Sequence, residues 1–343
     1  WVLFGWKRAD GLRRFRTAFV EVPRKNGKAL DCDTPILTEQ GWVRMGDLTT
    51  GDRVHAPDGT LVSVAYVSEV FEGHECYSVR FSSGQEIVAD AGHLWTVHDR
   101  YRERAVTVTT AEMAANYSVG SRTTHNERRY SVPVPEPLER PAAELPVDPY
   151  ILGLWLGDGT ATQARISTAD PEVLAALETA GYRLASVGHG CDYGIRGLRR
   201  PLRLLGVLGN KHVPSTYLLA SRAQRLALLQ GLMDSDGTVI LGNGVPRCEF
   251  TNVSRGLAEA VVFLARSLGW KATLREGRAT LRGRDCGAKY RVAWHAYRDA
   301  SPFRLPRKSD RLPVRPAMPS RSSTIQVVDV QPVESRPTRC IQV

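Results

Sequence analysis

The chain has 343 residues, of which 42% are hydrophobic and 24% are charged, a balance that is ordinary for a globular protein. Lysine and arginine (46) outnumber aspartate and glutamate (36), so the net charge is +10. No apolar run reaches the length of about eighteen residues that a membrane span needs, and no signal-peptide pattern opens the chain. The six cysteines form no CxxC pair, so we expect reduced thiols rather than a disulfide framework or a cysteine-bound metal.

Charge and length both divide the chain into segments. Acidic residues dominate 29–145, whereas basic residues dominate 1–28 and 146–343. This alternation favours separate modules with different partners, and the basic middle of the chain suits a nucleic acid as well as an ordinary solvated surface. At about 150 residues per domain, the length predicts two or three domains. Because the first residue is Trp1 and not Met, we expect a fragment of a longer protein.

The first segment ends in a partial phosphate-binding motif. Pro23–Lys28 reads PRKNGK and resembles the first half of a Walker A loop, in which backbone N–H groups and the lysine hold phosphates. The next residue should be Ser or Thr, but it is Ala29, and strand signals follow. Either the motif is an ordinary loop, or an ATPase sequence is interrupted between Lys28 and Ala29. Residues 1–28 resemble the approach to the Walker A loop of a phage terminase large subunit.

The rest of the chain predicts a mixed insert between two β-rich parts. Short alternating runs with Gly and Asp turns over 29–135 predict an all-β module, and strand-like runs return over 324–343. Helical and strand patterns alternate over 146–300, and two Pro-rich stretches, 136–148 and 301–323, predict linkers. This order predicts an α+β protein in which a mixed α/β domain is inserted into a discontinuous all-β domain.

Two helical motifs inside the insert share a pattern. Ile151–Gly159 and Leu229–Gly237 are rich in leucine, and each ends in Asp-Gly. Both helices begin at good caps, and both carry small residues four positions apart on one face, which lets two helix backbones approach closely. These caps and small residues are Asp148 with Pro149, Ser221, Gly153 with Gly157, and Gly231 with Ser235.

The aspartates that end these motifs, Asp158 and Asp236, would stand at the negative end of a helix dipole, which is unfavourable for a carboxylate. Two such carboxylates that meet at one end repel each other unless a cation lies between or beside them. Paired carboxylates with a divalent metal are an arrangement of two-metal phosphodiester cleavage. The alternative interpretation is that both Asp-Gly pairs are solvated helix ends.

The paired motifs resemble those of the LAGLIDADG homing endonucleases, and the resemblance covers about residues 145–300. It implies that Asp158 and Asp236 bind Mg²⁺ and that the domain cuts double-stranded DNA as a monomer acting on a pseudo-symmetric site. Trp155 and Gly157 depart from the family consensus, in which Ile and Ala are commoner, so activity does not follow from the motif alone.

A third run of the insert resembles the KHIP segment of those endonucleases that inteins carry. It spans Leu204–Pro214 and contains Lys211. The resemblance implies that Lys211 lies near the cleavage site, and a solvated surface lysine is the alternative.

A second set of candidate residues belongs to the β module. Its central part contains His93 and Trp95, and its last strand-like run contains Cys340. By itself a histidine beside an aromatic residue is usually packed core, and a lone cysteine is usually inert. Together with the interruption after Lys28, these residues resemble the Hint fold of inteins, in which a histidine closing a TxxH-like motif polarises the upstream splice-junction bond. Here that motif reads DAGH, and the run 33–52 resembles the intein N-terminal motif.

The first residue departs from most inteins, which begin with Cys or Ser. The interruption after Lys28 makes Ala29 the first residue, and alanine carries no nucleophile. The class-three inteins, marked by a Trp, a Cys and a downstream Thr, use an internal cysteine, and Cys340 matches it. Cys32 is the rival nucleophile, although it lies only two residues before Thr34, where the family usually leaves a longer gap.

The resemblance implies a complete reaction. The Cys340 thiolate would attack the carbonyl carbon of Lys28. His93 would donate a proton to the departing nitrogen of Ala29, and Trp95 would keep water from the thioester. The thioester would pass to a downstream hydroxyl, and cyclisation of a terminal Asn would release the intein. These residues and the Thr of the triad are expected after the last residue of the chain.

The sequence therefore predicts a self-splicing intein that carries a LAGLIDADG endonuclease within a phage terminase. The expected modules are an N-extein fragment (1–28), a Hint domain (29–135 and 324–343) and the endonuclease (146–300). The expected cofactor is Mg²⁺, and the expected partner is the double-stranded homing site in the terminase gene, with no membrane, in the cytoplasm of a bacterial or phage-infected cell. The alternative is a DNA-binding or terminase ATPase fragment with neither activity.

Overall fold

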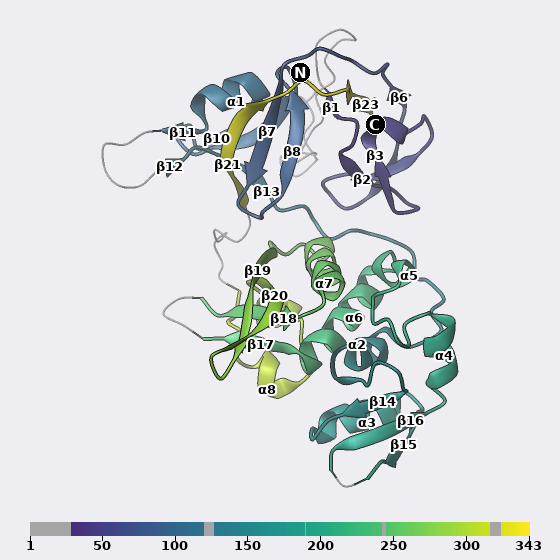
Figure 1. Ribbon diagram of the computed structural model, residues 1–343. Coiled ribbons are helices and arrows are strands. Elements are labelled where there is room, and N and C mark those ends of the chain that lie inside the picture. The colour runs from purple at the N-terminus through teal and green to yellow at the C-terminus, as the bar shows by residue number, and fades with distance from the viewer. Residues whose placement is uncertain (1–28, 120–126, 189, 242–244, 316–323) are drawn as a thin grey trace, which may run out of the picture. The chain divides into compact units, whose positions relative to one another are not determined.

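The computed structural model of the chain divides into two compact units, which Figure 1 shows with their elements. It describes residues 29–119, 127–188, 190–241, 245–315 and 324–343. Among these residues, the first unit combines 29–80 and 86–131 with the chain end, 327–343, and the second unit combines the middle of the chain, 132–326, with the short turn 81–85.

The first unit is built mainly of antiparallel strands. An eight-stranded sheet has the order β10-β9-β13-β21-β7-β8-β1-β22. Its strands are β1 (Leu30–Asp31), β7 (Cys76–Phe81), β8 (Glu86–Asp90), β9 (Leu94–Asp99), β10 (Arg104–Thr109), β13 (Tyr130–Pro133), β21 (Thr324–Val333) and β22 (Thr338–Arg339). One helix, α1 (Thr110–Asn116), begins at a capping box formed by Thr109 and Glu112.

Two-stranded ribbons complete this unit. They pair β2 (Pro35–Leu37) with β3 (Trp42–Arg44), β4 (Arg53–His55) with β5 (Leu61–Ser63), β6 (Tyr66–Val67) with β23 (Ile341–Gln342), and β11 (Ser118–Val119) with β12 (Glu127–Arg128). A single 3-10 turn, η1 (Met45–Asp47), follows β3. Met45, Leu48, Val54 and Val64 form the buried centre of the ribbons. The last residues of the chain thus pair with some of its first described residues.

The second unit repeats a helix-then-sheet arrangement. Helix α2 (Pro149–Asp158) precedes the sheet β14-β16-β15, and helix α6 (Arg222–Ser235) precedes the sheet β17-β18-β20-β19. The strands are β14 (Arg165–Ser167), β15 (Arg183–Ser186), β16 (Asp192–Arg196), β17 (Gly237–Ile240), β18 (Arg247–Asn252), β19 (Thr273–Leu281) and β20 (Arg284–Trp294). The other helices are α3 (Pro171–Thr179), α4 (Arg199–Leu204), α5 (Ser215–Leu218), α7 (Arg255–Ser267), the 3-10 turn η2 (Arg298–Ala300) and α8 (Pro306–Ser309).

This architecture confirms the predicted fold class, an α+β protein with a mixed α/β domain inserted into a discontinuous β domain. The module boundaries expected from the sequence stay predictions. The stretch expected to be a second linker, 301–323, does not behave as one over its described part. Phe303, Leu305 and Leu312 are buried in the core of the second unit, because they pack with its other apolar side chains.

Helices α2 and α6 meet through glycine. A Cβ added at Gly153 would lie 2.4 Å from the carbonyl oxygen of Leu228, and one added at Gly231 would lie 2.2 Å from that of Tyr150. Both distances are far inside van der Waals contact, so the helix backbones touch where the two glycines face each other. The predicted small-residue faces therefore form the interface. The predicted caps are present too: Asp148 accepts from Tyr150 and Ile151 N–H, and Ser221 forms a capping box with Gln224.

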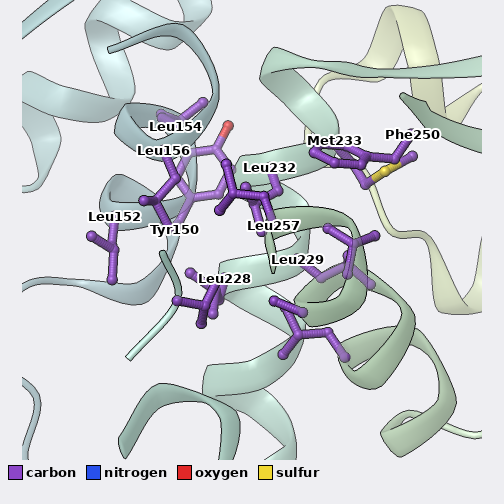
Figure 2. Close-up of a cluster of buried hydrophobic side chains, with 14 of the residues drawn as sticks. Tyr150, Leu152, Leu154, Leu156, Leu228, Leu229, Leu232, Met233, Phe250 and Leu257 are labelled. Atoms are coloured by element: carbon purple, nitrogen blue, oxygen red, sulfur yellow. The ribbon is translucent and has the colours of Figure 1, made fainter. Parts of the chain in front are cut away.

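Buried leucines of α2 and α6 belong to one hydrophobic cluster, which Figure 2 shows in close-up. Leu152, Leu154 and Leu156 of α2 and Leu228, Leu229 and Leu232 of α6 are no more than 1% exposed. Burying each such side chain stabilises the fold by about 1.5–3 kcal/mol. The ends of α2 and α6 are therefore held rigidly by the largest core of the second unit.

Replacing Gly231 by alanine should lower the free energy of unfolding of the second unit by about 3 kcal/mol or more, because backbone atoms on both helices must separate. Calorimetric or urea unfolding measures the loss. Gly256 of α7 is the matched control, since a Cβ there meets no heavy atom within 4 Å. Gly256→Ala should instead stabilise the unit by about 0.5–1 kcal/mol through helix propensity. Equal effects of the two changes would contradict the glycine contact.

Candidate active sites

The C-terminal ends of α2 and α6 bring two aspartates together. Asp158 is the last residue of α2, and Asp236 caps α6. A Cβ added at Gly157 would fall 1.9 Å from the Oγ of Ser235 and 3.6 Å from the Cγ of Asp236, so the two helix ends nearly touch. Only a residue without a side chain allows this approach. The carboxylates predicted from the two Asp-Gly motifs therefore share one site.

Both carboxylates are in an unfavourable environment for negative charge. Burial, followed by the charge of Asp236, raises the pKa of Asp158. Burial also raises the pKa of Asp236, against the opposing hydrogen bond that the Nδ2 of Asn252 donates to its Oδ2 at 3.2 Å. Two half-buried acids at the negative ends of two helix dipoles gain from a cation beside them.

Lys211 lies at the end of α2. Its Nζ donates to the carbonyl oxygens of Leu156 and Gly157, each at 3.0 Å, and stands 5.3 Å from the centre of the Trp155 ring. Burial lowers the pKa of Lys211, while Asp236 and Asp158 raise it. The residue predicted from the KHIP-like segment is thus a half-buried cation at the two aspartates, and the alternative of a solvated surface lysine is wrong.

A second lysine, Lys308, occupies the corresponding place at the end of α6. Its Nζ donates to the carbonyl oxygens of Met233 (2.9 Å), Asp234 (2.7 Å) and Gly237 (2.7 Å). Burial lowers its pKa, and Asp158 and Asp236 are among the charges that oppose this shift. Each helix end therefore has one aspartate and one lysine that binds its terminal carbonyl groups.

Sequence reasoning missed Lys308 because it lies in the Pro-rich stretch expected to be a linker. The repeated motif contained a signal for it. Because Lys211 follows the first helical motif, a second lysine could be expected after the second motif.

The segment that carries Lys308 is anchored by a buried acid. The Asp234 carboxylate accepts from the hydroxyl of Tyr150 at 2.9 Å and from the N–H of Arg304 at 3.0 Å, and it is 3% exposed. The N–H of Leu305 also donates to it. Asp234 therefore fixes the chain that leads into α8 and sets the position of Lys308. No sequence signal distinguished it from the neighbouring helix residues.

The two aspartates have the chemistry of a magnesium site that substrate phosphates complete. Among the described residues, no cluster of three or more His, Cys, Asp or Glu side chains is suited to bind a metal. Mg²⁺ is usually held by one or two carboxylates together with water and substrate phosphates, so Asp158 and Asp236 satisfy the protein's share. The lysines occupy the nearby helix carbonyl groups, which leaves the carboxylates as the acceptors of the site.

The second candidate site lies where the two ends of the first unit meet. Strands β1 and β22 are antiparallel, with Leu30 opposite Arg339 and Asp31 opposite Thr338. This ladder ends at Leu30 and Arg339, and Ala29 and Cys340 are the next residues on the two strands. The strand that ends just before the predicted nucleophile therefore pairs with the strand that begins just after the first residue of the predicted intein.

Cys340 and Ala29 are both fixed by the backbone around them. The N–H of Cys340 donates to the Oγ of Ser68 at 3.0 Å, and its carbonyl oxygen accepts from the N–H of Ser68 at 2.9 Å. Ala29 is fully buried, and its carbonyl oxygen accepts from the N–H of Asp90 at 3.0 Å. The other predicted junction residue, Lys28, lies outside the described residues.

His93 and Trp95 are neighbours at the start of β9. Their ring centres are 4.9 Å apart, with the rings edge to face. The indole Nε1 of Trp95 donates to the Oγ of Thr110 at 2.9 Å, and the N–H of Thr110 donates to the carbonyl oxygen of His93. Trp95 therefore holds the His93 ring in place. The sequence predicts a different role for Trp95, the exclusion of water.

The rival nucleophile, Cys32, is directed elsewhere. Its Cβ would lie 3.0 Å from a Cβ added at Gly46, so the side chain packs on η1. Burial and then the charge of Asp31 raise the pKa of the Cys32 thiol, which reduces the thiolate that could attack. Both observations weigh against Cys32 as the attacking thiol, and the choice of Cys340 stays a prediction.

No described helix has the length and apolar character that a membrane span demands.

The structure defines a two-part architecture: a divided β domain that is interrupted by a domain with two similar helical motifs. Comparison with known proteins agrees. A family model described as a LAGLIDADG-like domain matches residues 223–292. The replicative DNA helicase DnaB of Mycobacterium intracellulare is 36% identical over 336 residues, which cover 92% of this chain and 55% of that protein. The chain thus spans about half the length of this curated relative.

Two solved structures are also similar. The crystal structure of the MchDnaB-1 intein is 38% identical, over 24% of this chain and 60% of that one, with a TM-score of 0.22. A variant of the homing endonuclease I-DmoI in complex with its target DNA is 16% identical, over 45% of this chain and 91% of that one, with a TM-score of 0.29. The divided β domain and the family match together fit the architecture of a Hint domain with an inserted LAGLIDADG-like domain.

The expected terminase host is corrected by these comparisons, because the curated relative is a replicative helicase. That prediction rested on residues 1–28, which lie outside the described residues. A partial phosphate-binding loop is common to nucleotide-hydrolysing proteins of many kinds. A motif this short therefore does not separate a terminase from a helicase.

Proposed function

We propose that the first unit excises itself from a host protein by splicing and that the second unit is a DNA endonuclease. The observation that carries the splicing proposal is the pairing of β1 with β22, which ends at Leu30 and Arg339, the neighbours of Ala29 and Cys340. The observation that carries the nuclease proposal is the meeting of Asp158 and Asp236 between two lysines.

In the splicing reaction, the Cys340 sulfur attacks the carbonyl carbon of Lys28, and the bond from that carbon to the nitrogen of Ala29 breaks. His93 supplies the proton that the nitrogen needs, and Trp95 holds the imidazole and limits water. The upstream segment is then held as a thioester on Cys340. A downstream hydroxyl residue takes it over, and a terminal asparagine cyclises to free the intein.

In the nuclease site, Asp158 and Asp236 would hold Mg²⁺, which stabilises charge on a phosphate and lowers the pKa of bound water. Lys211 and Lys308 keep the helix ends closed through their carbonyl contacts and place positive charge beside the scissile phosphate. The two helix-then-sheet halves suit a DNA site with two similar halves, read by one chain. Binding through basic side chains should weaken as salt rises.

The host that the relatives support is a DnaB-type replicative helicase rather than a terminase. The homing site would then be the uninterrupted helicase gene, and both activities would take place in the cytoplasm of a bacterial cell.

The test is to express the full precursor that contains this chain and to weigh its products by mass spectrometry. Splicing predicts two products, the free intein and the joined host. The purified intein should also cut, with Mg²⁺ present, a duplex that spans the uninterrupted coding sequence around the junction. A precursor that stays one polypeptide, or a duplex that stays whole at every metal concentration, contradicts the respective activity.

A further inference from the structure

Asp90 contacts the backbone of Ala29, the first residue of the proposed intein. It is the last residue of β8, and its N–H donates to the carbonyl oxygen of Ala29 at 3.0 Å. The N–H of Ala29 in turn hydrogen-bonds to the Asp90 carboxyl group. That nitrogen belongs to the bond between Lys28 and Ala29, which splicing must break. Asp90 therefore holds both the N–H and the carbonyl group of Ala29.

The carboxyl group has room for one more partner. Asp90 is 1% exposed, and its Oδ1 has no hydrogen-bond partner in the described part of the chain. Its Oδ2 lies 3.4 Å from the Nδ1 of His74. A buried carboxyl oxygen without a partner costs about 1–3 kcal/mol and calls for an explanation.

Several titratable residues of the described part of the chain lie beside Asp90. They are His74, which precedes β7, Cys76, which is opposite Asp90 in the β7–β8 register, and His93, whose N–H donates to the Asp90 carbonyl oxygen at 3.1 Å. Burial raises the pKa of Asp90, and the bonds from Ala29 and His74 oppose the shift only in part. Because burial disfavours the ionised carboxyl group, Asp90 gains from a positive charge placed beside it.

We propose, resting on the splicing function above, that Asp90 captures the amino group released at Ala29 as an ammonium–carboxylate pair and so keeps the Cys340 thioester from reverting. The protons balance. When the Cys340 sulfur bonds to the Lys28 carbon, the carbon–nitrogen bond breaks and the thiol proton, carried by His93, gives a neutral amine. The amine then takes up one further proton, from the Asp90 carboxyl group where that group is protonated and otherwise from solvent, and the ammonium group donates to the Oδ1, which gains its missing partner.

This role matters because an amine reacts readily with a thioester and would re-form the original peptide bond. An ammonium group has no free electron pair and does not attack. Opposite charges in contact shift a pKa by about 1–3 units, so the amine of Ala29 stays protonated to a higher pH with Asp90 than without it. Asp90 is then a positioning residue before cleavage and a counter-ion after it.

The experiment uses the full precursor and measures how fast hydroxylamine releases the upstream segment, since this rate follows the thioester population. In the native precursor the release should persist to mildly alkaline pH. Asp90→Asn keeps the shape but loses the charge, and it should slow release about tenfold near neutral pH and lower the pH midpoint by about one unit or more. Asp90→Glu, which restores a carboxylate, should recover part of both.

The matched control is Asp31→Asn. Asp31 is also buried near the junction, but the Nη1 of Arg336 already neutralises it at 2.9 Å, so its loss should leave the pH midpoint unchanged. A merely structural role for Asp90 would lower release equally at every pH and leave the midpoint in place, and that result overturns the inference. So does release by Asp90→Asn at the native rate. A native precursor without any hydroxylamine-sensitive bond instead refutes the splicing proposal itself.

Discussion

Replacing Cys340 by alanine should abolish splicing and leave the precursor as one chain. Cys340 directly follows Arg339, which pairs with the residue after Ala29, and alanine offers no sulfur to carry the upstream segment. Without a nucleophile, the junction keeps the stability of an ordinary peptide bond, so the loss should exceed about a thousandfold in rate. Mass spectrometry of the purified precursor over time measures it.

Cys32 provides the control for this experiment. Cys32→Ala should splice at close to the native rate, because that side chain packs on η1 and its thiol pKa is raised by burial. If Cys32→Ala stops splicing while Cys340→Ala splices, the nucleophile is Cys32 and the assignment made from the register is wrong.

Changing either nuclease aspartate to asparagine should reduce DNA cleavage by about a thousandfold or more, while splicing continues. Asp158 and Asp236 are the two acids of the site, and asparagine keeps their shape without the charge that Mg²⁺ requires. Gel analysis of a cut duplex measures the nuclease, and mass spectrometry of the same preparation measures splicing. Asp299→Asn is the matched control, since Asp299 is an exposed acid that pairs with Arg315 in the same unit.

The same variants should be more stable than the native chain. A loss of cleavage can then be attributed to the missing carboxylate and not to unfolding. Burial and mutual repulsion raise the pKa of Asp158 in the folded chain, so its ionised form opposes folding at neutral pH. This cost is absent below about pH 4, where the acid is protonated in both states, and grows as pH rises through the folded pKa. Asp158→Asn should therefore raise the melting temperature at neutral pH without metal and change it little in acid. A simultaneous loss of splicing would contradict the independence of the two sites.

Local pattern was enough to predict much of the second unit. Glycines and a serine four positions apart mark one face of a helix, and only a close partner helix explains their repetition, so the contact at Gly153 and Gly231 followed from spacing. The Asp-Gly endings likewise located Asp158 and Asp236, because a helix cap and a helix end have fixed places in a motif. The β-rich flanks predicted a divided domain in the same way.

Other features depended on contacts between residues far apart in the chain. Lys308 and Asp234 belong to the nuclease site because a Pro-rich segment folds back onto α6, which no periodicity predicts. Asp90 faces Ala29 because β8 and β1 pair in one register, and a shift of one residue would turn its side chain to the other face of the sheet. Residue spacing along one element therefore determined which side chains share a face, and only the folded chain decided which faces meet.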